Sequence, residues 1–221
     1  MENIVIIGAR FDGHAKVVLE ILQAEGKYNM KGFIDDNINR KDEELRGFKI
    51  LGTTNDIPNI IQEFDIQGAI IAIGNNKIRR QLALIAKSYG LTIINTIHPT
   101  AIIDSDVVLG EGNVISQSAI IITGTKLNNY INIHAGVTID HDNVIEDGAN
   151  LAPGVHTAGR VIVKQDAFIG IGAVVIPDIT IGEGSVVGAG SAVISDVEPY
   201  VLVVGVPAKF KKNIYKPENL N

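Results

Sequence analysis

A six-residue repeat runs through the second half of the chain and constrains the fold more than any other feature. Steps of six residues from Ile103 to Val193 pass sixteen positions, and fifteen of them carry Ile, Leu or Val. Thr157 is the exception. Small or β-branched residues such as Ala119 and Ala149 are common two residues before these positions, and glycines cluster between them. A short fixed period of this kind predicts a solenoid, in which each repeat packs on its neighbours.

The first 99 residues have a different pattern, in which short aliphatic runs alternate with segments of helical spacing. We expect strands and helices, respectively, at residues 4–7, 30–34, 68–73 and 91–94, and at residues 13–25, 57–64 and 77–89. This alternation predicts an α/β domain with a small parallel sheet and right-handed crossovers. The expected organisation is an α/β domain over residues 1–99, a solenoid over residues 100–208 and a C-terminal tail over residues 209–221.

The composition excludes several classes of protein. Without cysteine the chain can form neither a disulfide framework nor a thiolate metal site. The net charge of -6 and the pI near 5.3 argue against nucleic acid as a partner. The longest apolar run, Ala69–Ile73, is too short to span a membrane, and the residues after Met1 lack the positive charges of a signal peptide. We therefore expect a cytoplasmic protein whose partners include neither a membrane nor nucleic acid.

A glycine-containing loop follows the first expected strand, with the sequence Ile7-Gly8-Ala9-Arg10-Phe11-Asp12-Gly13-His14. Glycines between a strand and a helix allow the backbone to approach a phosphate, and the helix N-terminus supplies N–H donors. Asp35 and Asp36 end the second expected strand, where acidic side chains commonly contact a ribose. The alternative interpretation is a loop and a turn that bind no ligand.

A second loop, Ile73–Arg80, joins a buried strand to a helix at the same edge of the predicted sheet. It contains Gly74 and Asn75. An asparagine that caps the following helix would explain the loop in structural terms alone. Ligands of open parallel sheets bind at the carboxyl ends of the strands, so a binding role is equally consistent with the sequence.

His141 lies inside the repeat region and is flanked by Asp140 and Asp142. A neighbouring carboxylate can hold an imidazole in one tautomer and increase its basicity, which suits a general base. Gly159 follows His141 by 18 residues, and its N–H could polarise a carbonyl in an acyl transfer if three repeats make one coil. The alternative is a histidine on a solvated surface.

The segment Val204–Lys209 reads V-G-V-P-A-K and is followed by Phe210, Lys211 and Lys212. This basic cluster follows a repeat region in which acids predominate. Lysine beside a turn suits a polyphosphate ligand. A solubilising tail is the alternative interpretation.

The six-residue period resembles the left-handed parallel β-helix of the hexapeptide acyltransferases, in which three hexapeptides form one coil of 18 residues. The ordered set of motifs resembles more specifically the nucleotide-sugar N-acetyltransferases of the bacillosamine and perosamine type, and the sialic-acid O-acetyltransferases are similar. These motifs are the glycine loop, the D-D pair, I-G-N-N-x-I-R, D-H-D and V-G-V-P-A-K. The resemblance extends from about Asn3 to Lys212.

The resemblance implies a Rossmann-like N-terminal domain that binds a nucleotide-linked amino sugar, and a β-helix that forms a homotrimer with acetyl-CoA between coils of adjacent subunits. It implies that His141 is the general base and that Asp142 orients it. The implied nucleotide-sugar site comprises Gly8, Gly13, His14, Asp35, Asp36, Gly74, Asn75 and His134. The implied acetyl-CoA contacts are Asn150, Gly159, Gly205, Pro207 and Lys209. The loop from Gly8 to Gly13 is two residues longer than the common family form, and some relatives have histidine in place of Asn150.

The expected reaction is direct transfer of an acetyl group from acetyl-CoA to the sugar amine, in surface glycan biosynthesis and with no metal. Acetylation of a sugar hydroxyl is the main alternative, because it would use the same residues. A metal enzyme like the γ-class carbonic anhydrases would need three histidine ligands, and His134, His141 and His156 are 7 and 15 residues apart. A non-catalytic protein that binds nucleotide sugars is the remaining alternative.

Overall fold

The computed structural model describes residues 1–9, 13–41 and 43–214 and divides the chain into two compact units. The first unit contains residues 1–99 together with 111–114. The second contains residues 100–110 and the chain from residue 115 onward. Each unit has its own hydrophobic core and is described by itself.

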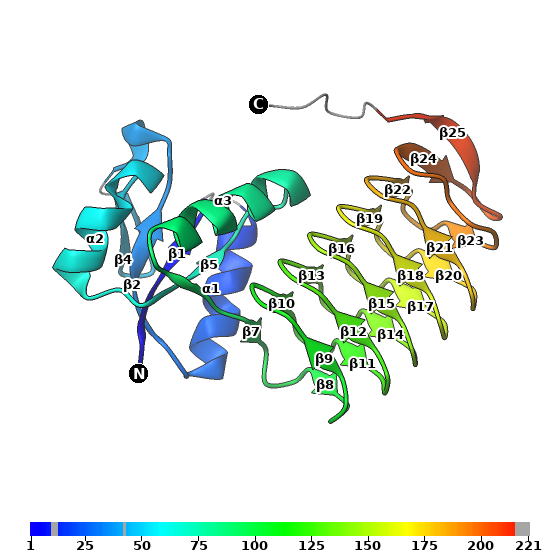
Figure 1. Cartoon of the computed structure of the whole chain (residues 1–221), viewed down its shortest axis with the longest axis horizontal. Coiled ribbons are helices and arrows are strands. Elements are labelled where there is room, and N and C mark those ends of the chain that lie inside the picture. The colour runs from blue at the N-terminus through cyan, green and yellow to red at the C-terminus, as the bar shows by residue number, and fades with distance from the viewer. Residues whose placement is uncertain (10–12, 42, 215–221) are drawn as a thin grey trace. The chain divides into compact units, whose positions relative to one another are not determined.

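The first unit is built on a six-stranded sheet with the order β3-β4-β2-β1-β5-β6 (Figure 1). Its strands are β1 (Asn3–Ile7), β2 (Asn29–Ile34), β3 (Glu44–Leu45), β4 (Phe48–Gly52), β5 (Gly68–Ile71) and β6 (Thr92–Ile93). Only β3 runs antiparallel to its neighbour. The helical segments and the remaining strand are α1 (His14–Glu25), η1 (Ile38–Arg40), η2 (Thr54–Asp56), α2 (Ile57–Phe64), α3 (Asn76–Ser88) and β7 (Thr96–Ile97).

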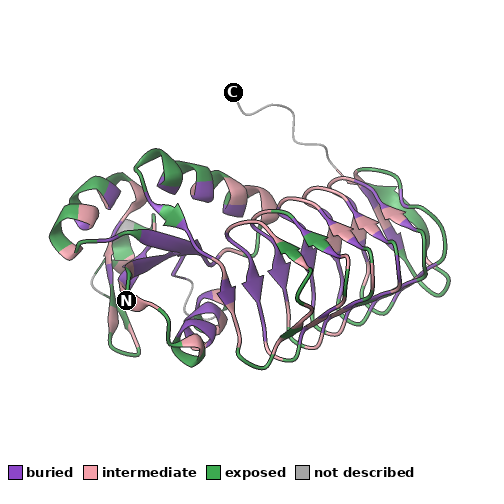
Figure 2. Cartoon of the chain, turned by 60° about the horizontal axis from the view of Figure 1, so that its bottom comes forward, coloured by how far each residue is buried: buried purple, intermediate pink, exposed green. Residues whose placement is uncertain are grey.

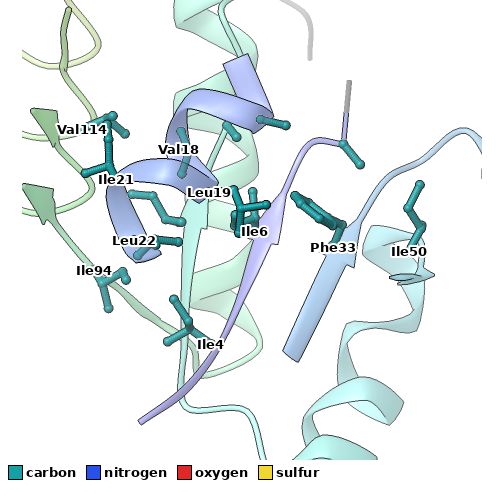
Figure 3. Packing of buried hydrophobic residues seen from close by; sticks show 14 residues of the cluster. Ile4, Ile6, Val18, Leu19, Ile21, Leu22, Phe33, Ile50, Ile94 and Val114 are labelled. Atoms are coloured by element: carbon teal, nitrogen blue, oxygen red, sulfur yellow. The ribbon is translucent and has the colours of Figure 1, made fainter. Parts of the chain in front are cut away.

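The core of the first unit forms where α1 packs on the central strand β1 (Figure 3). Ile4 and Ile6 of β1 lie against Leu19 and Leu22 of α1, and Phe33 of β2 continues the cluster. A buried parallel sheet places the carboxyl ends of β1, β2 and β5 at one edge, so the loops that follow these strands come together.

Three expected helices and four expected strands are present, with ends that differ by one to two residues. The antiparallel pair β3–β4 was not predicted. Its residues are interrupted by charges and by the turn at Arg46 and Gly47, and β3 has only two residues, so alternation of apolar side chains is absent from the sequence.

The second unit is a left-handed β-helix, which confirms the predicted fold class. Its sixteen short strands are spaced six residues apart, and Figures 1 and 2 show them stacked in coils. They are β8 (Ile102–Ile103), β9 (Val108–Leu109), β10 (Val114–Ile115), β11 (Ile120–Ile121), β12 (Lys126–Leu127), β13 (Asn132–Ile133), β14 (Thr138–Ile139), β15 (Val144–Ile145), β16 (Asn150–Leu151), β17 (His156–Thr157), β18 (Ile162–Val163), β19 (Phe168–Ile169), β20 (Val174–Val175), β21 (Thr180–Ile181), β22 (Val186–Val187) and β23 (Ala192–Val193).

Every third strand pairs in parallel with a partner one coil away in sequence, so residues 18 apart are neighbours. Ile121, for example, pairs with Ile103 on one side and with Ile139 on the other. The three faces of the prism are the sheets β9-β12-β15-β18-β21, β8-β11-β14-β17-β20-β23 and β10-β13-β16-β19-β22-β24. Below, these are called the first, second and third faces.

The residues of the six-residue repeat fill the interior of the prism. Fourteen of the sixteen repeat positions are buried, and the two half-buried ones, Ile103 and Leu109, lie in the first coil. Thr157 is also buried, although its hydroxyl group has no hydrogen-bond partner among the described residues. It is therefore a polar group in an otherwise aliphatic column.

The corners of the prism need a left-handed backbone conformation. Positive φ recurs at steps of six residues from Gly112 to Gly190, and glycine occupies eight of these fourteen positions. The other six are Ser118, Tyr130, Asp142, Arg160, Asp166 and Asp178. A side chain in this conformation costs about 1–2 kcal/mol relative to the right-handed region, so glycine is the favoured residue.

The chain ends its described part in an antiparallel hairpin of β24 (Val201–Val204) and β25 (Lys209–Asn213). Residues 209–213, which we expected to begin a tail, instead form this strand. The ladder to β24 supplies the hydrogen bonds that a sequence of charged residues did not suggest. In the described part of the chain, no helix is long and apolar enough to cross a bilayer.

Replacement of Thr157 by valine should stabilise the protein. The substitution keeps the shape of the side chain and removes a buried hydroxyl group that has no partner. We expect the free energy of unfolding to rise by about 1 kcal/mol, which corresponds to about 2–4 °C in Tm for a chain of this size. Thr180→Val is the matched control, because Thr180 is only half-buried. Thermal unfolding followed by circular dichroism measures both, and a lower Tm for Thr157→Val would contradict the assignment.

Candidate active site

A histidine–aspartate pair occupies a corner of the β-helix directly after β14. The Nδ1 atom of His141 lies 2.7 Å from Oδ2 of Asp142. The two side chains are 40% and 59% exposed, so the imidazole and the carboxylate are both accessible to a ligand. Because Nδ1 faces the carboxylate, an Nδ1–H tautomer leaves Nε2 free to accept a proton.

Two glycines in the adjacent coils provide the space for this pair. A Cβ atom at Gly159 would lie 2.5 Å from Cε1 of His141 and would also clash with Nε2. A Cβ atom at Gly124, in the preceding coil, would collide with Oδ1 of Asp142. The imidazole therefore rests against the backbone of the next coil, and the carboxylate rests against the backbone of the previous one.

The expectation that Gly159 lies one layer from His141 agrees with this geometry. The N–H of Arg160 donates to the carbonyl of His141 at 2.9 Å, which fixes the two coils relative to each other. Among the described residues, the N–H of Gly159 donates to no other group. A donor beside Nε2 of a histidine is the arrangement that can stabilise an oxyanion while the histidine accepts a proton.

Asn143 holds the backbone of this corner, and the sequence analysis did not identify it. Its fully buried amide nitrogen donates to the carbonyls of Asp140, His141 and Ala158 at 2.8, 3.1 and 2.9 Å. Thr125 also donates to the carbonyl of Asp140, at 3.0 Å. The available signal was an asparagine two residues before Ile145, where small or β-branched residues are usual in the repeat.

A second ion pair lies at the same corner in the next two coils. The guanidinium of Arg160 donates to Asp178 through Nε at 2.6 Å and through Nη2 at 2.8 Å. Hydrogen bonding to Asp178 raises the pKa of Arg160, and the charges of Asp178 and Asp142 add to the effect. The same hydrogen bonds from Arg160 lower the pKa of the Asp178 carboxyl group.

The first unit has a cavity of about 550 Å³ at the carboxyl ends of its strands. Six of the expected substrate residues line it: Gly8, Gly13, His14, Asp35, Gly74 and Asn75. Ala72, Ile73 and Ile78 supply apolar walls. The two loops that were identified separately in the sequence therefore border one cavity. Residues 10–12 of the longer glycine loop lie outside the described residues.

The two aspartates after β2 have different surroundings. The carboxylate of Asp35 lines the cavity and accepts hydrogen bonds from the N–H groups of Ala9 and Asn37, both at 2.9 Å. Asp36 does not line the cavity. Its carboxylate accepts hydrogen bonds from the N–H and the hydroxyl of Thr54, both at 2.8 Å, at the start of η2. The structure thus gives Asp36 a structural contact that the sequence did not reveal.

Arg79 is a further residue that the sequence analysis did not single out. It is completely buried in α3, and its guanidinium donates to the carbonyl of Ile73 at 3.0 Å and to Oδ1 of Asn76 at 3.1 Å. Asn75 caps α3 by accepting a hydrogen bond from the N–H of Ile78 at 3.0 Å. These bonds hold the second loop in the shape that borders the cavity.

Several expected site residues do not lie near His141 within one chain. His134 follows β13 and Asn150 belongs to β16, so both are on the third face, whereas His141 follows β14 of the second face. Asn150 is also only 2% exposed. Gly205 and Pro207 form the turn after β24, and Lys209 begins β25 at the C-terminal end of the β-helix.

The described part of the chain contains no cluster of three or more His, Asp or Glu side chains that could hold a metal ion. His134 and His156 lie on different faces of the prism. His156 instead contacts Thr138 of the adjacent coil, with 2.6 Å between Nδ1 and the hydroxyl oxygen.

Comparison with known proteins gives matches to both units. The PglD N-terminal domain family matches residues 3–84, and the bacterial transferase hexapeptide family (six repeats) matches residues 160–195. GDP-perosamine N-acetyltransferase of Escherichia coli O157:H7 is 29% identical over 187 residues, which are 81% of each protein.

Two solved structures match almost the whole chain. PerB from Caulobacter crescentus, in complex with CoA and GDP-perosamine, is 35% identical with a TM-score of 0.89 over 96% of this chain and 98% of that one. Two variants of that enzyme, in which a histidine is replaced by asparagine or alanine, match equally well. The acetyltransferase domain of PglB from Neisseria gonorrhoeae, in complex with acetyl coenzyme A, is 31% identical with a TM-score of 0.88 over 95% and 99%.

Replacement of Gly8 by alanine should destabilise the first unit more than a positive φ alone requires. Gly8 has φ +99°, and a Cβ atom there would lie 2.7 Å from Cγ1 of Ile73. Gly26→Ala is the matched control, because Gly26 has φ +65° and open space around it. We expect a loss of about 1 kcal/mol for the control and at least ~2 kcal/mol for Gly8→Ala. Urea unfolding measures the difference, and equal losses would contradict the close approach of Ile73.

Proposed function

The chain belongs to the nucleotide-sugar N-acetyltransferases of the bacillosamine and perosamine type, and we propose that its own substrate is a GDP-linked amino sugar. Members of this family transfer the acetyl group of acetyl-CoA to the amine of a nucleotide-linked sugar, and this chain is an enzyme of that kind. The observation that carries the active site is the contact of His141 with Asp142 on one side and Gly159 on the other. The preference for GDP is supported by two relatives that match nearly full length and act on or bind GDP-perosamine.

The cavity of the first unit is the proposed nucleotide-sugar site. The N-terminus of the 12-residue helix α1, beginning at His14, borders the cavity and presents N–H groups that favour an anionic diphosphate. Gly8 allows the backbone to approach closely, and Ile78 offers an apolar surface. The domain division at residue 99, with sugar-nucleotide binding before it and acyl transfer after it, is part of the same proposal.

The proposed reaction is a direct transfer in a ternary complex. The neutral sugar amine attacks the thioester carbonyl, and a new N–C bond forms while Nε2 of His141 accepts the amine proton. Asp142 stabilises the resulting imidazolium through Nδ1, and the N–H of Gly159 stabilises the oxyanion. The C–S bond then breaks, and the thiolate of CoA leaves and takes up the proton. Holding both substrates in place supplies much of the rate enhancement.

Acetylation of a hydroxyl group would use the same residues, so the choice of an amine needs a separate observation. The near full-length relatives named above carry N-acetyltransferase activity on perosamine in their descriptions. This similarity favours the amine over the hydroxyl group.

A homotrimer is proposed, with acetyl-CoA between the coils of adjacent subunits. The second face of the prism carries exposed aliphatic side chains that an interface would bury, namely Ile102 and Val174 on its strands and Ile176 and Ile194 just after them. An intersubunit site would also allow residues of different faces, such as His134 and Asn150, to approach one cofactor. Gly205, Pro207 and the cation of Lys209 are proposed to meet its adenosine end.

The cytoplasm is the proposed location, because acetyl-CoA and nucleotide sugars are both available there. The acetylated product would then serve surface glycan biosynthesis.

An assay of CoA release tests this function. The chain is incubated with acetyl-CoA and a panel of GDP-, UDP- and dTDP-linked amino sugars, and we expect turnover to be greatest with GDP-perosamine. His141→Ala should lower kcat by about 10²–10⁴-fold, which is the usual contribution of a general base. Light scattering shows whether the variant keeps the oligomeric mass of the wild type. Turnover near the wild-type rate in an intact oligomer would refute the role of His141.

Gly159→Ala provides a second test of the site. The added methyl group would occupy the position of the imidazole edge, so it should displace His141 from the oxyanion donor. We expect kcat to fall at least ~10²-fold, since removal of an oxyanion donor alone has this effect. Gly172→Ala is the control, because Gly172 is also in a coil but has open space around it. An unchanged kcat for Gly159→Ala would contradict the proposed geometry.

A further inference from the structure

Asp142, Arg160 and Asp178 form a column of charged residues, called here the charged corner, in three consecutive coils. All three have the left-handed conformation, with φ of 59°, 60° and 64°. Their N–H groups donate to the carbonyls of Thr123, His141 and Gly159 at 3.0, 2.9 and 3.1 Å, so the coils at this corner are tied layer to layer.

Glycine would meet the conformational requirement of these positions without strain, and it does so at most other corners. The other two corner columns never have non-glycine residues at this conformation in two consecutive coils. Backbone strain that is retained at one place in a repetitive fold is a sign of function there. The charged corner begins at the proposed base and extends past Gly159, which places the strain beside the reacting groups.

Asp178 holds Arg160 in a fixed position. The guanidinium uses Nε and Nη2 to make two parallel hydrogen bonds with the carboxylate oxygens, at 2.6 and 2.8 Å. A bidentate pair of this kind restricts the direction of an exposed arginine. The charge of Asp142 contributes to the raised pKa of Arg160, so the two groups lie within electrostatic range of each other.

The other charges around Asp142 are mostly negative. Asp106 accepts a hydrogen bond from the N–H of Gly124 at 3.0 Å, in the coil against which the Asp142 carboxylate rests. Asp140 accepts one from the N–H of His141 at 2.8 Å. Asp104, which accepts from the N–H of Thr123 at 2.8 Å, is a further acid of this group. Arg160 is thus the cation that opposes the repulsion on an exposed carboxylate.

We propose that Arg160 is a positioning residue that acts through Asp142: held by Asp178, it keeps the Asp142 carboxylate in the orientation that accepts from Nδ1 of His141. This inference rests on the proposed role of His141 as the base. Both charges are largely exposed, and screening by water and salt limits their interaction, so the expected effect on the rate is modest.

A double-mutant cycle tests the proposal. Arg160→Gly removes the charge and introduces the residue that most corners of this fold already have. Asp142→Asn removes the carboxylate charge, and asparagine tolerates the left-handed conformation. Arg160→Lys restores a positive charge without the planar fork. Asp166→Gly is the matched control, because it replaces a charged residue of the same conformation at another corner.

In the wild-type background, Arg160→Gly should lower kcat about two- to five-fold with KM for both substrates unchanged. Arg160→Lys should recover part of this loss, and the loss should shrink at about 0.5 M salt. In the Asp142→Asn background, Arg160→Gly should have no further effect, and Asp166→Gly should have none in either background. An equal loss in both backgrounds would overturn the proposal, as would a higher KM for acetyl-CoA with kcat unchanged.

A measurement that needs no turnover separates this inference from the proposed function. The imidazole ¹⁵N resonances of His141, identified by their loss in His141→Ala, report which nitrogen carries the proton. Arg160→Gly should reduce the population of the Nδ1–H tautomer, whereas Asp166→Gly should leave it unchanged. If no amino sugar is acetylated, the proposed function fails while this result still tests Arg160. An unchanged tautomer population in Arg160→Gly would refute the inference.

Discussion

The parallel pairing of residues 18 apart is the constraint on which the rest of the second unit depends. Each coil donates its backbone N–H groups to the next, as Ile120 does to Val137 and Arg160 to His141. A pairing register that is repeated without a break gives every side chain a fixed neighbour in the coils above and below. The contact between His141 and Gly159 is therefore a product of the same hydrogen bonds that hold the solenoid together.

The active site uses gaps in this regular lattice. Side chains at Gly124 and Gly159 would occupy the positions of the Asp142 carboxylate and the His141 ring, so the two absent Cβ atoms shape the site as much as the two functional groups do. Asn143 then replaces an apolar corner residue with an amide that binds three carbonyls. The site thus requires only local departures from a fold that is stabilised everywhere else by aliphatic layers.

Periodicity makes most of the second unit predictable from the sequence. Steps of six residues identified the interior of the prism, and a step of 18 residues placed Gly159 beside His141. The contacts of Asn143, Arg79 and Asp36 were not predictable, because each depends on the direction of carbonyl or N–H groups in turns that have no period. The lysines of β25 were assigned to a tail for a related reason: a ladder partner compensates for their poor strand propensity.

The stacking of coils also makes the β-helix a ruler for its long acyl donor. Three coil steps separate His141 from the layer of Ser195, close to the turn at Gly205, and neighbouring strands are about 4.8 Å apart, so the separation is about 14 Å. Insertion or deletion of a whole coil would change this length by a single increment and keep the interior intact. Relatives with fewer or more coils between the base and the terminal turn should consequently differ in the length of the thioester cofactor segment that they span.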